Sequence, residues 1–175
     1  YAPPRDTAHA LIAPLLGHEH DDAGLDVIGG GAGAIPILLQ LAVVLDMPEA
    51  HESAVALGLH LVNRANRRPE GWSWGSVGTI NARDLTGFAH GAAGYAYALL
   101  ELWQATGNDA FRYGAEQAFA YEAHHFDDSA GNWPDFRCPE WYGILRNPRQ
   151  LAAARAAIQR GEDAPRYVTH HMTAW

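Results

Sequence analysis

Lysine is absent from this chain of 175 residues, and all 12 of its basic side chains are arginine. The 20 acidic residues give a formal net charge of -8, which disfavours nonspecific binding to nucleic acid. The missing lysine also bears on the glycine run 29–33, because a P-loop needs a Lys-Ser/Thr pair and a dinucleotide fingerprint needs a preceding strand. We therefore expect no nucleic-acid partner and no nucleotide site. The arginine-only, alanine-rich composition favours a bacterial source.

Cysteine is nearly absent as well. Cys138 stands alone, which excludes an internal disulfide framework and fits a reducing compartment. No run of 18 apolar residues occurs, and no charged segment followed by an apolar stretch opens the chain, so neither a membrane span nor a signal peptide is expected. These features favour a cytoplasmic location. The chain begins at Tyr1 rather than Met and ends at Trp175, which suggests a part of a larger protein.

Apolar residues are abundant at 48% of the chain, against 18% charged, and this balance predicts one globular domain with a sizeable core. Two nearly continuous apolar stretches, 34–45 and 95–105, follow glycine-rich loops and predict helices buried on most faces, with Pro36 in the first turn of the earlier one. Segments 48–66 and 110–125 repeat apolar residues at helical spacing and predict peripheral helices. The sequence predicts an all-α fold with inner and outer helix layers.

The glycines are spaced as a repeat. Adding 61 to Gly30 and Gly33 gives Gly91 and Gly94, and the order of glycine loop, inner helix, turn and outer helix then occurs twice. We expect repeat units at approximately 26–66 and 87–126. The remainder, 127–175, is expected to be rich in loops, with one short helix near 147–160.

Three features of the sequence each allow a purely structural and a functional interpretation. Residues 18–22 (HEHDD) are conceivable metal ligands, but such clusters in loops are usually solvated. Trp72 and Trp74 either line a pocket or pack in the interior, and packing is the commoner fate of such side chains. His90, at the mouth of the second apolar helix, is either a helix cap or a catalytic group.

Three segments in order resemble a known family. Residues 26–33 (DVIGGGAG), 85–94 (LTGFAHGAAG) and 131–135 (GNWPD) are similar to successive signatures of the lanthionine synthetase C-like cyclases. The closest resemblance is to the C-terminal cyclase domain of the class II lanthipeptide synthetases. It implies an α/α toroid with the glycine loops gathered at one end. The implied reaction adds cysteine thiols of a precursor peptide to dehydroalanine or dehydrobutyrine, with Zn²⁺ holding the thiol.

The resemblance carries two catalytic positions onto this chain. His90 matches the active-site histidine of the family's His-Gly motif and is expected to act as general acid or base. Asp26 matches the aspartate before the first glycine loop and is expected to orient that acid/base machinery. The family's zinc ligands, a Cys and a later Cys-His pair, are expected beyond Trp175, with Cys138 a bystander in the wrong motif.

We therefore expect no specific metal site within these residues, and no cyclase activity from them alone. An incomplete ring is also expected to expose apolar inner helices, which favours self-association.

Two other classes stay open on the sequence. A helical-toroid glycosidase or terpene-type cyclase would use loop aromatics and acids, whose candidates are Trp72, Trp74, Trp133, Asp127 and Asp135. A non-catalytic peptide-binding toroid would lack the metal ligands altogether. The spatial separation of the carboxylates tests the first alternative, and the zinc content of the intact protein tests the second.

Overall fold

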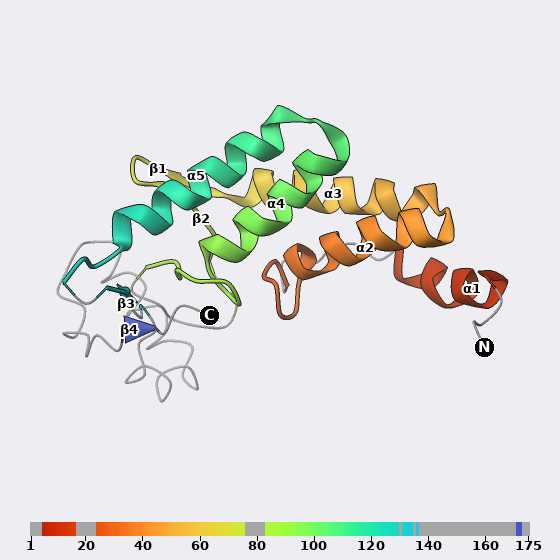
Figure 1. Ribbon diagram of the computed structural model, residues 1–175, viewed down its shortest axis with the longest axis horizontal. Coiled ribbons are helices and arrows are strands. Elements are labelled where there is room, and N and C mark those ends of the chain that lie inside the picture. Colours follow the sequence, from red (N-terminus) through yellow and green to blue (C-terminus); the bar gives the residue numbers. More distant parts are fainter. Residues whose placement is uncertain are drawn as a thin grey trace, which may run out of the picture.

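A computed structural model describes residues 5–16, 24–75, 83–129, 131–134, 136 and 171–172, and Figure 1 shows their arrangement. The described part is mostly helical, which confirms the all-α prediction. The helices are α1 (Arg5–Leu16), α2 (Gly31–Leu45), α3 (Pro48–Arg64), α4 (Ala92–Thr106) and α5 (Asp109–His125). The strands are β1 (Asn66–Arg68), β2 (Gly71–Ser73), β3 (Trp133–Pro134) and β4 (His171–Met172).

Helices α2 and α3 form the first hairpin. Asp46 ends α2 in the left-handed conformation, with φ of 57°, and Pro48 occupies the start of α3, where its missing N–H costs nothing. The outer helix thus begins where the sequence predicted. Pro36 does not lie in the first turn as expected: α2 begins at Gly31, which places the proline in the second turn.

Helices α4 and α5 form the second hairpin. Gly107 ends α4 with φ of 68°, a conformation that favours glycine, and its N–H bonds to the carbonyl of Trp103 at 2.7 Å. The Asn108 side chain then accepts a hydrogen bond from the N–H of Ala110 at 3.0 Å, which caps α5. The predicted turn and the predicted start of the outer helix are therefore confirmed.

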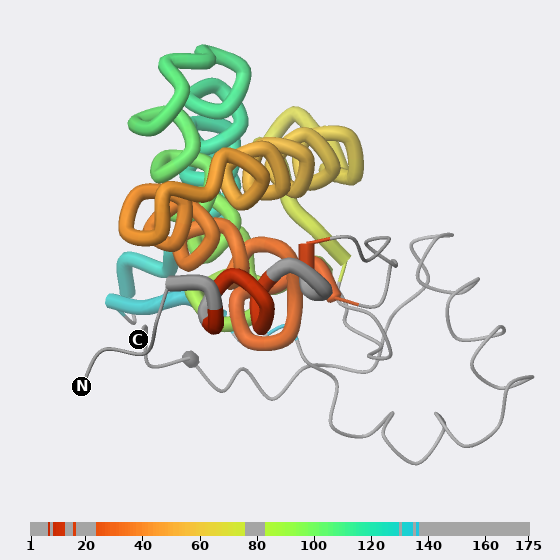
Figure 2. Tube along the Cα trace, turned by 90° about the vertical axis from the view of Figure 1, so that its right-hand side faces the viewer, coloured from red at the N-terminus to blue at the C-terminus, as the bar shows by residue number. Residues whose placement is uncertain are grey.

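The two hairpins lie side by side, with α2 against α4 as an inner layer and α3 and α5 outside them (Figures 1 and 2). The interior between the layers is filled by fully buried Leu61, Leu99, Leu102 and Phe111. The layers approach closely at Gly58, where an added Cβ would lie 2.1 Å from Leu102 Cδ1. The described helices therefore form an arc of a two-layered helical ring.

The expected burial of both inner helices is correct for α4 and wrong for α2. Eight residues of α4 are buried, whereas Ile37 and Val43 of α2 are 60% and 82% exposed. The reason is position: α4 is packed between α2 and α5, while α2 contacts α3 and α4 and only touches α1. The exposed apolar surface on an inner helix is the kind that the sequence predicts for an open ring.

Short strands follow the outer helices. β1 and β2 pair antiparallel with Arg67 opposite Trp72, in a stretch expected to be a loop, and β3 pairs with β4. Within the described ranges, no helix is long and apolar enough to cross a membrane. Cluster 18–22, Cys138, Asp135 and the helix expected near 147–160 lie outside the described residues.

Candidate functional site

The glycine loops before α2 and α4 make equivalent backbone contacts. The N–H of Gly31 bonds to the carbonyl of Gly24 at 2.9 Å, and 61 residues later the N–H of Ala92 bonds to that of Leu85 at 3.1 Å. Gly33 and Gly94 repeat this pattern with the carbonyls of Asp26 and Gly87, at 3.3 and 3.4 Å. Each loop thereby satisfies N–H groups that the first turn of its helix leaves free.

Glycine is required in the first turn of both inner helices, because the backbone of the preceding loop approaches closely there. A Cβ on Gly33 would lie 2.0 Å from the carbonyl oxygen of Val27, and one on Gly94 would lie 2.0 Å from that of Phe88. These two carbonyls are themselves 61 residues apart. The glycine pattern in the sequence therefore reflects a loop that folds back tightly on the start of its helix.

The two loops meet at Asp26 and His90. Oδ2 of Asp26 lies 2.7 Å from Nδ1 of His90, across 64 residues of sequence. The N–H of Val27 also donates to the carbonyl of Ala89 at 3.3 Å, so the backbones are joined beside the side-chain pair. The structure thus brings together the two positions that the family resemblance singles out.

The Asp26 carboxylate is held in place by its surroundings, while the His90 ring stays accessible to solvent. Oδ1 of Asp26 accepts from the N–H of Gly29 at 2.8 Å, which fixes the carboxylate, and the side chains of Asp26 and His90 are 24% and 48% exposed. A carboxylate at Nδ1 favours the tautomer that carries the proton there. Nε2 then has a lone pair to accept a proton from a substrate. His90 does not cap α4, whose N-cap is Gly91.

A buried carboxylate from the outer helix supports the loop that carries His90. Oε1 of Glu122 in α5 accepts from the N–H of Gly87 at 2.8 Å and from the N–H of Ala93 at 2.7 Å. Burial raises the pKa of Glu122, and the two hydrogen bonds act in the opposite direction. Glu122 was not among the residues predicted from the sequence. The repeat itself carried a signal, because Glu122 falls 61 positions after Leu61, a core leucine.

An aromatic stack lies behind the loops. Trp74 and Tyr95 stack with ring centroids 4.3 Å apart, and the indole N–H of Trp74 donates to the carbonyl of Leu61 at 2.8 Å. Burial raises the pKa of Tyr95, and the carboxylates of Asp26 and Asp84 raise it further. Trp72 is also buried. Trp72 and Trp74 therefore pack in the core, which is the commoner of the two fates considered from the sequence.

The remaining loop groups named as sugar-binding candidates also have structural contacts. Trp133 donates its indole N–H to the carbonyl of Glu122 at 2.8 Å, and Asp127 accepts hydrogen bonds from Ser129 at 2.6 and 2.9 Å. Asp127 therefore organises its own turn. The other candidate carboxylate, Asp135, lies outside the described residues, so the separation of the two carboxylates is not tested.

A metal site is not built from the described part of the chain. Over those residues, no group of three His, Cys, Asp or Glu side chains lies close enough to hold a metal ion. Asp26 and His90 supply two donor groups, but they hydrogen-bond to one another. The residues described here thus do not fit the zinc site that the family resemblance implies.

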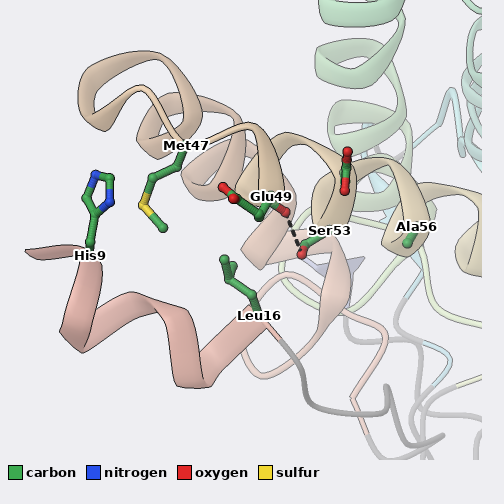
Figure 3. A pocket seen from close by; sticks show the side chains of 7 residues that line it. His9, Leu16, Met47, Glu49, Ser53 and Ala56 are labelled. Atoms are coloured by element: carbon green, nitrogen blue, oxygen red, sulfur yellow. Dashed lines mark hydrogen bonds between the residues drawn. The ribbon is translucent and has the colours of Figure 1, made fainter.

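A separate groove of about 620 Å³ lies between α1 and the start of α3 (Figure 3). His9 and Ser53 line it, and both hydrogen-bond to backbone carbonyls: the His9 ring to that of Leu45 in α2 at 3.0 Å, and the Ser53 hydroxyl to that of Glu49 at 2.8 Å. None of its lining residues belongs to the glycine loops. This groove is where α1 meets the first hairpin.

The two-layered helical arc, with a glycine loop before each inner helix, has the architecture of an α/α toroid. The family profile described as lanthionine synthetase C-like protein matches residues 6–150, and the chain belongs to this family. No curated protein and no solved structure matches the sequence.

Proposed function

We propose that this chain is part of a lanthionine-forming cyclase domain and that Asp26 and His90 are its acid/base pair. The observation that carries the proposal is the 2.7 Å contact between Asp26 Oδ2 and His90 Nδ1, which joins two loops from different helical hairpins. The family match supports the reaction class, which is the addition of a peptide thiol to a dehydroamino acid. We place the reaction in a bacterial cytoplasm.

The proposed reaction requires two proton movements. Nε2 of His90 takes the proton from the cysteine S–H, the sulfur bonds to Cβ of the dehydroamino acid, and the electron pair of the broken C=C π bond moves toward Cα and the adjacent carbonyl. A proton delivered to Cα from the imidazolium completes the thioether. Asp26 holds the ring in the tautomer that accepts at Nε2 and stabilises the imidazolium.

The precursor peptide is the substrate, and the half-exposed His90 ring is accessible to it. We assign the zinc that the resemblance implies to ligands outside the described residues, and we derive no step through a metal. These 175 residues by themselves are expected to form no thioether. We further propose that the exposed apolar side chains of α2, among them Ile37 and Val43, favour self-association of the chain.

The test uses the full-length protein that contains this chain and a model peptide carrying one cysteine and one dehydroalanine. His90→Asn should lower the rate of thioether formation by about 10²- to 10⁴-fold, the usual contribution of a general acid or base. The control is His51→Asn on α3, outside the glycine loops. Mass spectrometry after thiol alkylation measures the remaining free thiol.

An unchanged rate in the His90→Asn variant would contradict the proposed role. If the wild-type protein binds the peptide but leaves its thiol free at every zinc concentration tried, the non-catalytic peptide-binding toroid replaces the cyclase.

A further inference from the structure

The loops before α2 and α4 differ in how the second N–H of each helix is satisfied. In α2 the N–H of Ala32 bonds to the backbone carbonyl of Leu25 at 3.0 Å. In α4 the equivalent N–H, of Ala93, bonds instead to Oε1 of Glu122 at 2.7 Å. A side chain from the outer helix has therefore taken the place of a backbone carbonyl in the loop that carries His90.

The same oxygen holds both sides of the His90 segment. Gly87 lies three residues before His90 and Ala93 three residues after it, and both N–H groups point to Glu122 Oε1, at 2.8 and 2.7 Å. Gly87 has φ of 93°, a conformation that favours glycine, the residue with the most backbone freedom, and the hydrogen bond to Glu122 restricts that freedom. The carboxylate closes the loop from both ends.

The first hairpin provides an internal reference. The position equivalent to Glu122 there is Leu61, fully buried, and the position equivalent to His90 is Gly29. A buried carboxylate is costly compared with a leucine in a packed interior. The buried carboxylate occurs in the second hairpin, whose loop holds His90, and the first hairpin has a leucine at that position.

From this geometry we propose that Glu122 is a positioning residue, which fixes the His90 loop so that the imidazole meets Asp26 in the geometry needed for catalysis. Glu122 is only 6% exposed, whereas the side chain of His90 is 48% exposed. It acts through the two backbone N–H groups and does not touch the substrate. At the N-terminus of α4, which has glycine as its N-cap, the carboxylate is also favourably placed against the helix dipole.

The inference rests on the proposed function of His90, so its test combines an activity measurement with one that needs no activity. In the full-length protein, Glu122→Leu installs the residue of the first hairpin and removes both hydrogen bonds. We expect kcat for thioether formation to fall by about 10²-fold, the typical cost of a misplaced catalytic group, with KM changed less than about threefold. The NMR signals of the His90 ring nitrogens should shift, and the amides of Gly87 and Ala93 should exchange at least about tenfold faster.

Two further variants separate positioning from folding. Glu122→Gln keeps an acceptor oxygen at the same distance, so it should restore kcat to within about tenfold of wild type. Glu116→Gln, on the exposed face of α5 where Glu116 pairs with Arg112 at 3.0 Å, is the control and should change nothing. Should Glu122→Leu not fold, Glu122→Asp takes its place, because the shorter side chain cannot reach both amides.

A folded Glu122→Leu or Glu122→Asp variant with wild-type kcat and unshifted His90 signals would overturn the inference. Failure of the proposed function is a different result: His90→Asn then leaves thioether formation unchanged, while the His90 ring signals still respond to Glu122.

Discussion

The first hairpin with its loops, residues 24–74, and the second, residues 85–133, share backbone contacts and differ in chemistry. Both glycine loops fold back on their inner helix through hydrogen bonds 61 residues apart. Yet the first supplies the carboxylate of Asp26 and has Gly29 where the second has His90. The difference teaches that the scaffold does not require the histidine, and that the proposed acid/base pair is formed by a contact between two neighbouring units.

The likeness extends past the outer helices. Asn66 pairs with Ser73 in the hairpin of β1 and β2, while Asp127 pairs with Asn132 in an isolated bridge that closes a loop two residues shorter. Each is followed by a tryptophan whose indole N–H donates at 2.8 Å to the outer helix, Trp74 to Leu61 and Trp133 to Glu122. We therefore propose that each unit runs beyond the bounds 26–66 and 87–126 to include this tryptophan.

The largest effect should come from removing Trp74, a buried tryptophan of the first unit. Trp74→Ala should cost about 4 kcal/mol of unfolding free energy, because the side chain is 1% exposed and its loss leaves a cavity. Trp133→Ala should cost about 1–2 kcal/mol, since Trp133 is only half-buried. Denaturant unfolding of both variants measures the gap. Equal costs would show that the two tryptophans are more alike in packing than their exposure indicates.

Alanine at the close-approach glycines should cost nearly as much in either unit. Gly33→Ala and Gly94→Ala should each lose about 3 kcal/mol, because the new Cβ would lie 2.0 Å from a backbone carbonyl oxygen. Gly29→Ala is the matched control, with its nearest atom 4.0 Å away, and should stay within about 0.5 kcal/mol of wild type. A large cost at only one of Gly33 and Gly94 would break the equivalence of the loops.

Acid sensitivity should belong to the second unit. Burial lowers the pKa of His125 to about 4, with Arg83 and His124 acting in the same direction, whereas the equivalent residue in α3 is Arg64. The native state thus prefers neutral His125. Its contribution is fully present above the unfolded pKa of about 6.5 and is lost as pH falls toward the folded value. His125→Phe should flatten the decline of unfolding free energy over that range, and an unchanged slope would contradict this assignment.

The smallest effect on stability is expected on the exposed face of α2. Val43 is 82% exposed, and the equivalent residue of α4 is Gln104. Val43→Gln should leave the free energy of unfolding within about 0.5 kcal/mol of wild type, because little buried surface changes. Sedimentation equilibrium should nevertheless show weaker self-association. The same association constant in both proteins would place the contact elsewhere.

Local signals in the sequence predicted much of the fold. Pro48 and Asn108 mark the starts of the outer helices because caps and N-terminal prolines act within one turn. The glycine spacing located both loops, since close approach leaves no room for a Cβ. Burial of α2 could not be read from its apolar composition, because composition does not say which neighbours cover a helix. β1 was missed because its three residues are exposed and show no alternation.

The site was predictable only in part, for a physical reason. Asp26 and His90 came from the family resemblance, and their contact across 64 residues depends on how two hairpins pack. Glu122 lies four and seven residues after Ala118 and Ala115, which places it on the buried face of α5, but its two amide partners are set by tertiary structure. Comparing the two repeat units would have identified Glu122, because a glutamate stands there where the first unit has the core residue Leu61.

The central claim, that Asp26 and His90 act as one acid/base unit, is tested most directly by a double-mutant cycle on the rate of thioether formation. Residues that act as a unit have strongly non-additive effects. The Asp26→Asn and His90→Asn variants should each be slow, and the double variant should be about as slow as His90→Asn alone. A double variant slowed by the product of the two single losses would contradict the claim.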